Sequence, residues 1–277
     1  MLYKIKNIIL FSVLNIFIVF INNASSETVK QNGGISTTRI EFKLIHRSTP
    51  TVVFETGLGA TMESFNKTVN EIGKTNTVFA YNRPGYGKSA KHSTSRTGAT
   101  IVDELRAFLQ NKELYPPYIL AGHSVGGLYM QLFARKYPDE IAGLILIDPT
   151  HPTQFENVGA IENQPKLVQL LFNLWLSPAA KAEFAELKNT GTEVLSLPTP
   201  NNIPIIILSV EDKGNTELAR FTNNKRKDFS RLYPTSKQIW LSGRHDIPRQ
   251  NPGAITYAIR DILEKLRRKY DKILNND

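Results

Sequence analysis

The chain of 277 residues contains no cysteine, which excludes disulfide bonds, thiol catalysis and a cysteine-linked lipid anchor. A domain of this size buries enough apolar surface to fold without covalent cross-links. Apolar residues make up 41% of the chain and charged residues 21%, so disorder by composition is also excluded. The length favours one large α/β domain with an insertion over two full domains.

Acidic residues are fewer than basic ones. The chain has 25 Asp and Glu and 34 Lys and Arg, which gives a formal net charge of +9. Much of the excess lies in Lys225-Arg226-Lys227 and in the stretch from Lys265 to Lys272. We interpret such runs as solvated helix faces, with attraction to an anionic envelope surface or nucleic acid as the alternative. No basic motif with interleaved aromatic residues is present, so nucleic acid is not expected as a partner.

Long apolar runs are absent after residue 26, and residues 1–26 are typical of a secretory signal peptide. Lys4 and Lys6 precede the apolar run Ile8 to Ile21, and small residues follow it. The run is shorter than the roughly 20 residues that a membrane-spanning helix needs. We therefore predict cleavage after Ala24 or Ser26, with an uncleaved anchor as the alternative. Residues 27–277 are expected to be periplasmic or secreted in a bacterium, without a stable membrane span.

Apolar periodicity alternates between strand and helix along the rest of the chain. Strands are predicted at residues 39–45, 51–54, 77–81, 118–121, 144–147, 205–208 and 237–241, and helices at 62–72, 99–114, 125–137 and 254–270. This alternation predicts a mainly parallel sheet covered on both faces by helices. It stops between Asp148 and Pro204, where two further helices are predicted at 165–176 and 178–188. We interpret about 150–202 as an inserted helical cap.

The sequence G-H-S-V-G at residues 122–126 is a nucleophile elbow, because a predicted strand precedes it and a predicted helix follows it. Small neighbours leave room for a strained turn that lifts the Ser124 hydroxyl above the carboxyl edge of the sheet. Ser124 is therefore the candidate nucleophile.

A serine hydroxyl needs a base, and the chain has five histidines. His245 lies in a loop between the last predicted strand and the last predicted helix, where the order Ser…Asp…His places the base. His151 is the alternative. His46 and His92 are expected at the surface, and His123 is expected to pack or to form hydrogen bonds within the elbow.

Two aspartates are candidates for the acid that orients the imidazole. Asp148 ends the strand at 144–147, and Asp212 follows the strand at 205–208. Asp148 could instead cap a turn, and Asp212 could be an ordinary loop residue. From the residues alone, both aspartates therefore remain candidates for the acid.

An oxyanion formed on an acyl carbonyl needs backbone N–H donors. The amide of Val125, directly after the nucleophile, is one candidate. The amide of Leu58, which lies between Gly57 and Gly59 after the strand at 51–54, is the other. A plain glycine turn is the alternative for this second segment.

Three segments together resemble the α/β-hydrolase family, in particular its exported, esterase- or lipase-like serine hydrolases. Residues 78–89 (VFAYNRPGYGKS) resemble the family's arginine-proline-glycine loop, residues 122–127 its elbow, and residues 137–148 the stretch that follows. The resemblance spans about residues 39–270. It implies the α/β-hydrolase fold with a small helical cap inserted after the sixth strand of that fold, two oxyanion amides and carboxyl-ester hydrolysis.

The chain departs from the family pattern at two places. The oxyanion loop often carries His-Gly in the family and here reads Thr56-Gly57. The usual position of the acid falls on Lys213, one residue past Asp212. The run that begins at Asp148 is similar to a subgroup that takes its acid from the end of the preceding strand, so the resemblance favours Asp148.

We therefore expect a serine hydrolase that cleaves carboxylic esters through a Ser-His-Asp triad and an acyl-enzyme. A small-molecule ester with an apolar acyl group is the expected substrate, although the apolar cap residues could equally serve cap packing. Those residues are Leu167, Leu170, Leu171, Phe172, Leu174, Trp175 and Leu176. A proline-type aminopeptidase and a non-catalytic binding protein on the same scaffold are the alternatives. No metal or cofactor motif is found, and the oligomeric state cannot be read from the sequence.

Overall fold

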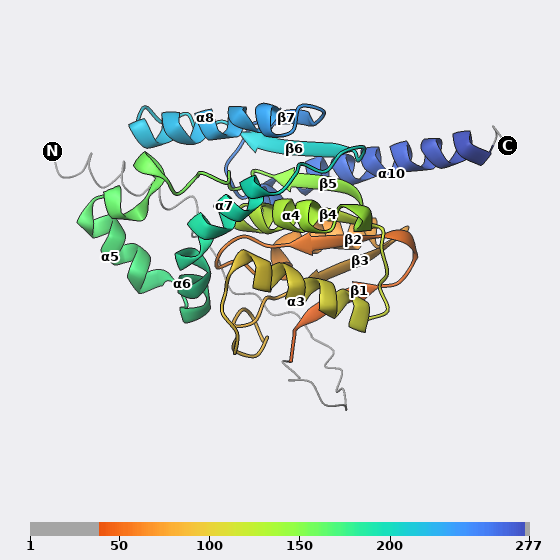
Figure 1. The fold of residues 1–277 in the computed structure, drawn as a ribbon, viewed down its shortest axis with the longest axis horizontal. Helices are drawn as coiled ribbons and strands as arrows, with labels where there is room; N and C mark the ends of the chain where they lie inside the picture. The colour runs from red at the N-terminus through yellow and green to blue at the C-terminus, as the bar shows by residue number, and fades with distance from the viewer. Residues whose placement is uncertain (1–38, 275–277) are drawn as a thin grey trace.

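The computed structural model describes residues 39–274, so the predicted signal peptide lies outside the described residues. A sheet of seven strands forms the centre of the molecule, in the order β1-β3-β2-β4-β5-β6-β7 (Figure 1). The strands are β1 (Phe42–Ile45), β2 (Ser48–Glu55), β3 (Asn76–Tyr81), β4 (Tyr118–His123), β5 (Ile141–Ile147), β6 (Ile205–Val210) and β7 (Lys237–Leu241). Among the strands of residues 39–274, only the β1–β3 pairing is antiparallel, which confirms the predicted mainly parallel sheet.

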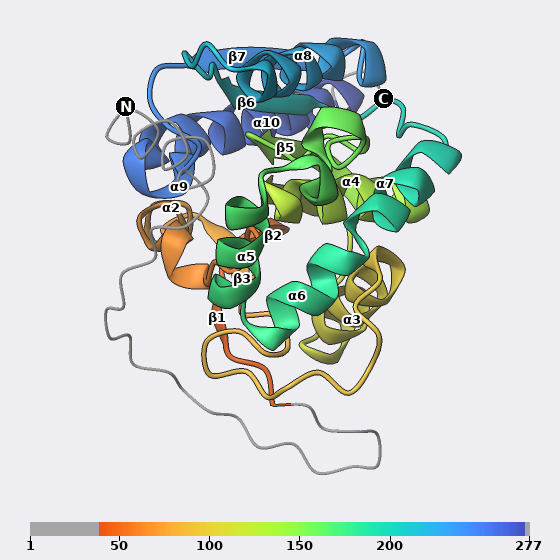
Figure 2. The ribbon, with the colours of Figure 1, turned by 90° about the vertical axis from the view of Figure 1, so that its left-hand side faces the viewer.

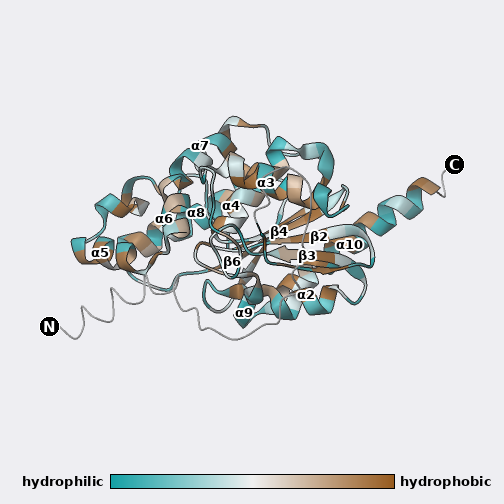
Figure 3. Ribbon diagram, turned by 90° about the horizontal axis from the view of Figure 1, so that it is seen from below, coloured by the Kyte–Doolittle hydropathy of each residue, from teal (hydrophilic) through white to brown (hydrophobic). Residues whose placement is uncertain are grey.

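Strand residues alternate between two apolar cores, one on each face of the sheet. Val53 and Leu120 face a core with α3 (Gly98–Asn111) and α4 (Val125–Lys136). Their neighbours face a second core with α2 (Asn66–Ile72), α9 (Ile247–Gln250) and α10 (Pro252–Leu274). Figure 3 shows α3 and α4 on one side of the sheet and α2 and α9 on the other. Because both faces are covered, the central strands read as nearly continuous apolar runs.

The helical insertion lies between β5 and β6, so it follows the fifth strand of the described residues rather than a sixth. It contains α5 (Lys166–Trp175), α6 (Pro178–Ala185) and α7 (Leu187–Ser196). Two of these helices match the predicted ones, and α7 was not separated from α6 by the sequence. Ser177 caps α6 by accepting a hydrogen bond from the Ala180 amide at 3.2 Å. Figure 2 shows α5 and α6 side by side at one end of the sheet.

Helix α8 (Glu217–Leu232) was missed by the sequence analysis, which treated its middle as a charge run. Thr216 caps it, and Ala219, Phe229 and Leu232 are its buried residues. The prediction that residues 225–227 form a solvated face was wrong for the first two of them, because only Lys227 is exposed. The second basic run, at the end of α10, is exposed as predicted.

No helix within residues 39–274 is both long enough and apolar enough to span a membrane.

Candidate active site

Ser124 occupies the turn between β4 and α4 with φ 54° and ψ −122°, a conformation that non-glycine residues rarely adopt. The turn is crowded on all sides. A Cβ added to Gly126 would lie 2.5 Å from the carbonyl oxygens of Glu55 and Thr56, and one added to Gly122 would lie 2.5 Å from the Gly126 carbonyl oxygen. Glycine at these positions is therefore what lets the strained turn form.

The imidazole of His245 reaches Ser124 from the loop between β7 and α9. Its Nε2 lies 2.9 Å from the Ser124 hydroxyl, and its Nδ1 lies 2.6 Å from Oδ2 of Asp148. A carboxylate can only accept, so Nδ1–H donates to Asp148 and Nε2 is left to accept from the hydroxyl. The structure thus brings three sequence-predicted residues into one hydrogen-bonded series.

Asp148 ends β5 at φ 37°, and its side chain is almost fully buried. Arg226 of α8 forms two ion-pair hydrogen bonds with it, Nε to Oδ1 and Nη2 to Oδ2, both at 2.8 Å. The Val210 amide adds a longer contact to Oδ1 at 3.4 Å. Burial acts to raise the pKa of Asp148, but the hydrogen bond and charge of His245, together with Arg226, outweigh it and hold the pKa well below its usual range. Asp148 is therefore ionised at neutral pH.

Asp212, the other predicted acid, is placed differently. Its Oδ1 accepts a hydrogen bond from the Gly214 amide at 2.8 Å, which closes a local turn. Its backbone exchanges two hydrogen bonds with the side chain of Asn223 in α8, at 2.9 and 2.8 Å. The hydrogen bond from Nδ1 of His245 is accepted by Asp148 and not by Asp212.

Leu58 and Val125 both line the cavity that contains Ser124 and His245. The loop after β2 packs directly on the elbow, since a Cβ at Gly57 would lie 3.2 Å from the Ser124 Cβ. Arg83 donates to the carbonyl oxygen of Gly57 at 3.1 Å. Because a trans peptide directs its C=O and N–H in opposite directions, this bond turns the Leu58 N–H away from Arg83.

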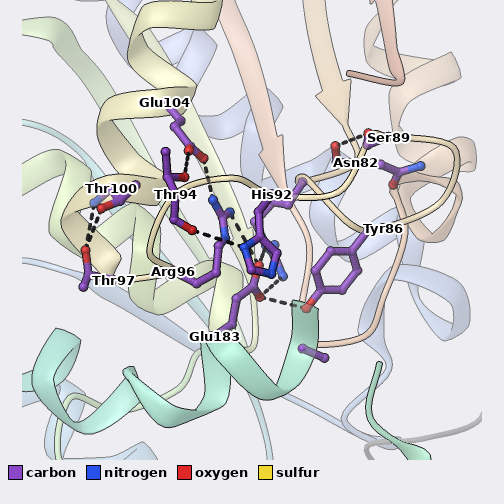
Figure 4. A network of polar contacts seen from close by, with 12 residues as sticks. Asn82, Tyr86, Ser89, His92, Thr94, Arg96, Thr97, Thr100, Glu104 and Glu183 are labelled. Carbon is purple, nitrogen blue, oxygen red and sulfur yellow. Dashed lines mark hydrogen bonds and ion pairs between the residues drawn. The ribbon is translucent and has the colours of Figure 1, made fainter. Parts of the chain in front are cut away.

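Behind that loop, Arg83 is fully buried and paired with two carboxylates. It bonds Glu55 through Nη1 and Glu183 of α6 through Nε and Nη2, the last two at 2.9 Å. The Tyr86 hydroxyl donates to Glu183 at 2.8 Å, and Figure 4 shows Tyr86 and Arg96 both directed at Glu183. This buried ionic cluster joins the candidate oxyanion loop to helix α6.

His123 and His151 are both buried near the site. His123 Nε2 donates to the carbonyl oxygen of His245 at 2.8 Å, which holds the His245 loop. Burial, followed by the charge of His245, lowers the pKa of His123 to about 3. His151, the alternative base, lies 3.1 Å from Asp228, and burial followed by Lys225 lowers its pKa to about 4. The structure therefore pairs Ser124 with His245 and leaves His151 in the cavity wall.

A cavity of about 680 Å³ opens at Ser124. Its apolar side lies under the helical insertion, and its polar side lies along the segment from β6 into α8. The apolar side includes Phe155, Ile161, Val168, Phe172 and Phe184, and the polar side includes Glu211, Asp212, Lys213, Asn215, Thr216 and Lys225. Among residues 39–274, no group of three or more His, Asp and Glu side chains could hold a metal ion.

Most of the apolar cap residues singled out in the sequence do not line this cavity. Phe172 does, whereas Leu167, Leu170, Leu174 and Trp175 are exposed, between 55% and 68%, and Leu176 is buried. The side chain of Leu171 lies outside the described residues. The exposed residues alternate along α5 with the cavity-lining ones, so the apolar run of the sequence covers both sides of one helix.

Three functional candidates escaped the sequence analysis: Arg226, Arg83 and Glu183. Each depends on contacts between segments far apart in the chain, such as 78 residues between Asp148 and Arg226. The amphipathic spacing of Leu218, Phe229 and Leu232 in α8 was the available signal for placing Arg226 on a helix.

Comparison with known proteins agrees with this fold. A family model described as the alpha/beta hydrolase fold matches residues 50–246. The uncharacterized protein YqjL of Bacillus subtilis is 35% identical over 222 residues, covering 76% of this chain and 83% of that protein. YbdG of the same organism is 23% identical over 261 residues, covering 78% and 80%.

Solved structures share the fold. A thermophilic esterase from Thermogutta terrifontis is similar with a TM-score of 0.61 and 20% identity, covering 87% of this chain and 99% of that one. The mouse alpha/beta hydrolase domain-containing protein 10 gives a TM-score of 0.61 and 18% identity, covering 88% and 100%. At these identities the likeness concerns the fold.

Proposed function

The chain belongs to the α/β-hydrolase family, and we propose that it is a serine hydrolase that cleaves carboxylic esters through an acyl-enzyme. The observation that carries the proposal is the hydrogen-bonded series from the Ser124 hydroxyl through the His245 imidazole to the Asp148 carboxylate. In this assignment Ser124 is the nucleophile, His245 the base and Asp148 the acid that orients the base.

Acylation follows from these contacts. His245 Nε2 takes the hydroxyl proton while Ser124 Oγ attacks the ester carbonyl carbon, and Asp148 stabilises the imidazolium that forms. The amides of Leu58 and Val125 donate to the oxyanion. His245 then gives its proton to the leaving alcohol oxygen as the C–O bond breaks, which leaves the acyl group on Ser124.

Deacylation repeats the steps with water. His245 takes a proton from water as the hydroxide attacks the acyl carbonyl, and the second oxyanion uses the same two amides. Collapse breaks the bond to Ser124 Oγ, which receives the proton back from His245. The products are a carboxylic acid and free enzyme.

The shape of the cavity supports a small-molecule ester with an apolar acyl group. Phe155, Phe172 and Phe184 offer an apolar surface next to Ser124, and the segment from β6 into α8 offers polar groups for the alcohol part. We further propose that the protein is exported after removal of residues 1–26, which the intact mass of protein recovered from the producing cell's envelope would test.

A panel of p-nitrophenyl esters of graded acyl length tests the function. We expect turnover by the wild type and a loss of about 10⁴-fold or more in kcat for Ser124→Ala. A fluorophosphonate probe should label the wild type and leave Ser124→Ala unlabelled. Preferential cleavage of proline p-nitroanilide would instead favour an aminopeptidase, and absence of both labelling and turnover would favour a non-catalytic binding protein.

A further inference from the structure

Arg226 contacts the carboxylate of Asp148 as a fork. Its Nε and Nη2 each lie 2.8 Å from a different carboxylate oxygen, and 11% of its side chain is exposed. Such a two-bond pair fixes the plane of a carboxylate as well as its position, which a lysine ammonium does not do. The orientation of Asp148 is therefore set from α8 and not only from its own strand.

The same carboxylate oxygen serves both the arginine and the base. Oδ2 of Asp148 accepts from Arg226 Nη2 and from His245 Nδ1. Because the backbone of Asp148 has a positive φ, its side chain leaves the strand at an unusual angle. Besides the bond to His245, this carboxylate accepts two hydrogen bonds from Arg226 at 2.8 Å, and the Val210 amide lies farther away at 3.4 Å.

Arg226 is itself held on two sides. Its Nη1 donates to Asn223 at 3.2 Å, and its backbone carbonyl accepts from Gln238 of β7 at 2.9 Å. Asn223 also holds the backbone of Asp212, whose loop lines the cavity. The arginine thus connects the cavity wall to the hydrogen-bonded series that ends at Ser124.

The charge of Arg226 also acts on Asp148. Together with His245 it holds the pKa of this buried carboxyl well below its usual range. Asp148 therefore keeps its negative charge where it accepts the hydrogen bond from Nδ1 of His245.

We propose that Arg226 is a positioning residue of the active site, which holds the Asp148 carboxylate, as an anion, toward Nδ1 of His245. This inference rests on the proposed function. Arg226 bonds Asp148 and acts through it on His245.

The test compares Arg226→Met, Arg226→Lys and a matched control, Arg231→Met. Arg231 lies on the same helix and forms the same two-bond pair with an aspartate, Asp228, at 2.8 and 2.7 Å, but on the surface. We expect Arg226→Met to lower kcat by about 10- to 100-fold, as removal of supporting partners does at other sites, with little change in KM.

Arg226→Lys keeps the charge and loses the fork, so it should recover part of the lost kcat, and Arg231→Met should match the wild type. A wild-type kcat in Arg226→Met, or an equal loss of kcat in Arg231→Met, would overturn the proposal. If Arg226→Met does not fold by circular dichroism, Arg226→Lys decides, because a kcat equal to that of the wild type would mean that the fork is not needed.

A readout independent of turnover separates this proposal from the function it rests on. A low-field proton resonance from a His245 Nδ1–H bonded to Asp148 is expected in the wild type and in Arg231→Met, and should be lost or broadened in Arg226→Met. Wild-type protein that gives this pattern but cleaves no ester would refute the proposed function and leave the positioning role intact. An unchanged resonance in Arg226→Met would refute the positioning role.

Discussion

Two arginines, Arg83 and Arg226, flank the elbow, and they are used in different ways. Arg83 lies on the β2–β3 side, with no exposed side-chain surface, between Glu55 and Glu183. Arg226 lies on the β5–β6 side, slightly exposed, against Asp148. Both bond a carboxylate through a fork, and each holds one part of the proposed machinery: Arg83 the candidate oxyanion loop, Arg226 the candidate acid.

The difference lies in what each cluster holds. Around Arg83 the partners are carboxylates, a phenol and backbone carbonyls, none of which exchanges a proton in the proposed reaction. Around Arg226 the carboxylate also bonds His245, which gains and loses a proton in each half of the cycle. Damage to the first cluster should therefore appear mainly in stability, and damage to the second mainly in rate.

The largest expected effect comes from Asp148→Asn. The amide keeps the size of the side chain but removes the charge that stabilises the imidazolium, and it can present an N–H to His245 Nδ1. We expect kcat to fall about 10³- to 10⁴-fold. Ester hydrolysis by the purified protein measures the fall in kcat. The midpoint of thermal unfolding should change much less in proportion. A variant with near wild-type kcat would remove Asp148 from the proposed triad.

The next effect concerns the other arginine. Arg83→Met leaves Glu55 and Glu183 buried without their cation, which costs about 3–5 kcal/mol of unfolding free energy. We expect the midpoint of thermal unfolding to drop by about 10 °C. Arg260→Met is the matched control, because Arg260 pairs with Glu71 on the surface, where an ion pair contributes little to stability. Equal shifts for the two variants would contradict the assignment of a structural role to the buried cluster.

A smaller effect, the pH dependence of the unfolding free energy, also distinguishes the Arg226 side of the elbow from the Arg83 side. The pKa values of His123 and His151 are lowered to about 3 and about 4, mainly by burial. Below about pH 6.5 the unfolded chain binds protons that the folded chain does not. The unfolding free energy should therefore fall as the pH is lowered. The contribution of His151 is lost between about pH 6.5 and pH 4, and that of His123 between about pH 6.5 and pH 3.

Each histidine contributes a slope of up to about 1.4 kcal/mol per pH unit. Denaturant titrations between pH 7 and pH 5 measure the total, and His151→Gln should reduce it by roughly one histidine's share. Glu183→Gln, on the Arg83 side, should lower the stability without changing the histidine contribution. A slope that stays the same in His151→Gln would mean that His151 is protonated in the folded protein.

Local pattern was enough to predict the fold and the strand-to-helix turn at Ser124. The elbow was visible in the sequence because Gly122 and Gly126 stand two residues on either side of Ser124, although the contacts that require glycine at position 126 come from Glu55 and Thr56. His245 could be located because its place between the last strand and the last helix follows from the order of elements. The same order does not give α8, whose charged residues hide its apolar spacing.

The partners of a charged residue could not be predicted in this way. Arg226 stands in a basic run that is typical of a solvated surface, and only the position of α8 relative to β5 and β6 directs it to Asp148. Arg83 and Glu183 are 100 residues apart and meet because the inserted α6 returns to the edge of the sheet. Such pairs depend on how the helices and strands are arranged in the tertiary structure. Composition and periodicity do not predict that arrangement.

The smallest expected effect tests the choice between the two predicted acids. Asp212→Asn should leave kcat within about twofold of the wild type, because an asparagine oxygen still accepts from the Gly214 amide and that turn contributes only tenths of a kcal/mol. Steady-state hydrolysis of the same ester used for Asp148→Asn gives a direct ratio of the two effects. The sequence placed Asp212 one residue short of the usual position of the acid, and in the structure its carboxylate accepts from the Gly214 amide of its own loop, while Asp148 bonds both Arg226 and His245. If Asp212→Asn instead lost activity a hundredfold and Asp148→Asn did not, the arginine on α8 would be holding a carboxylate that the reaction does not use.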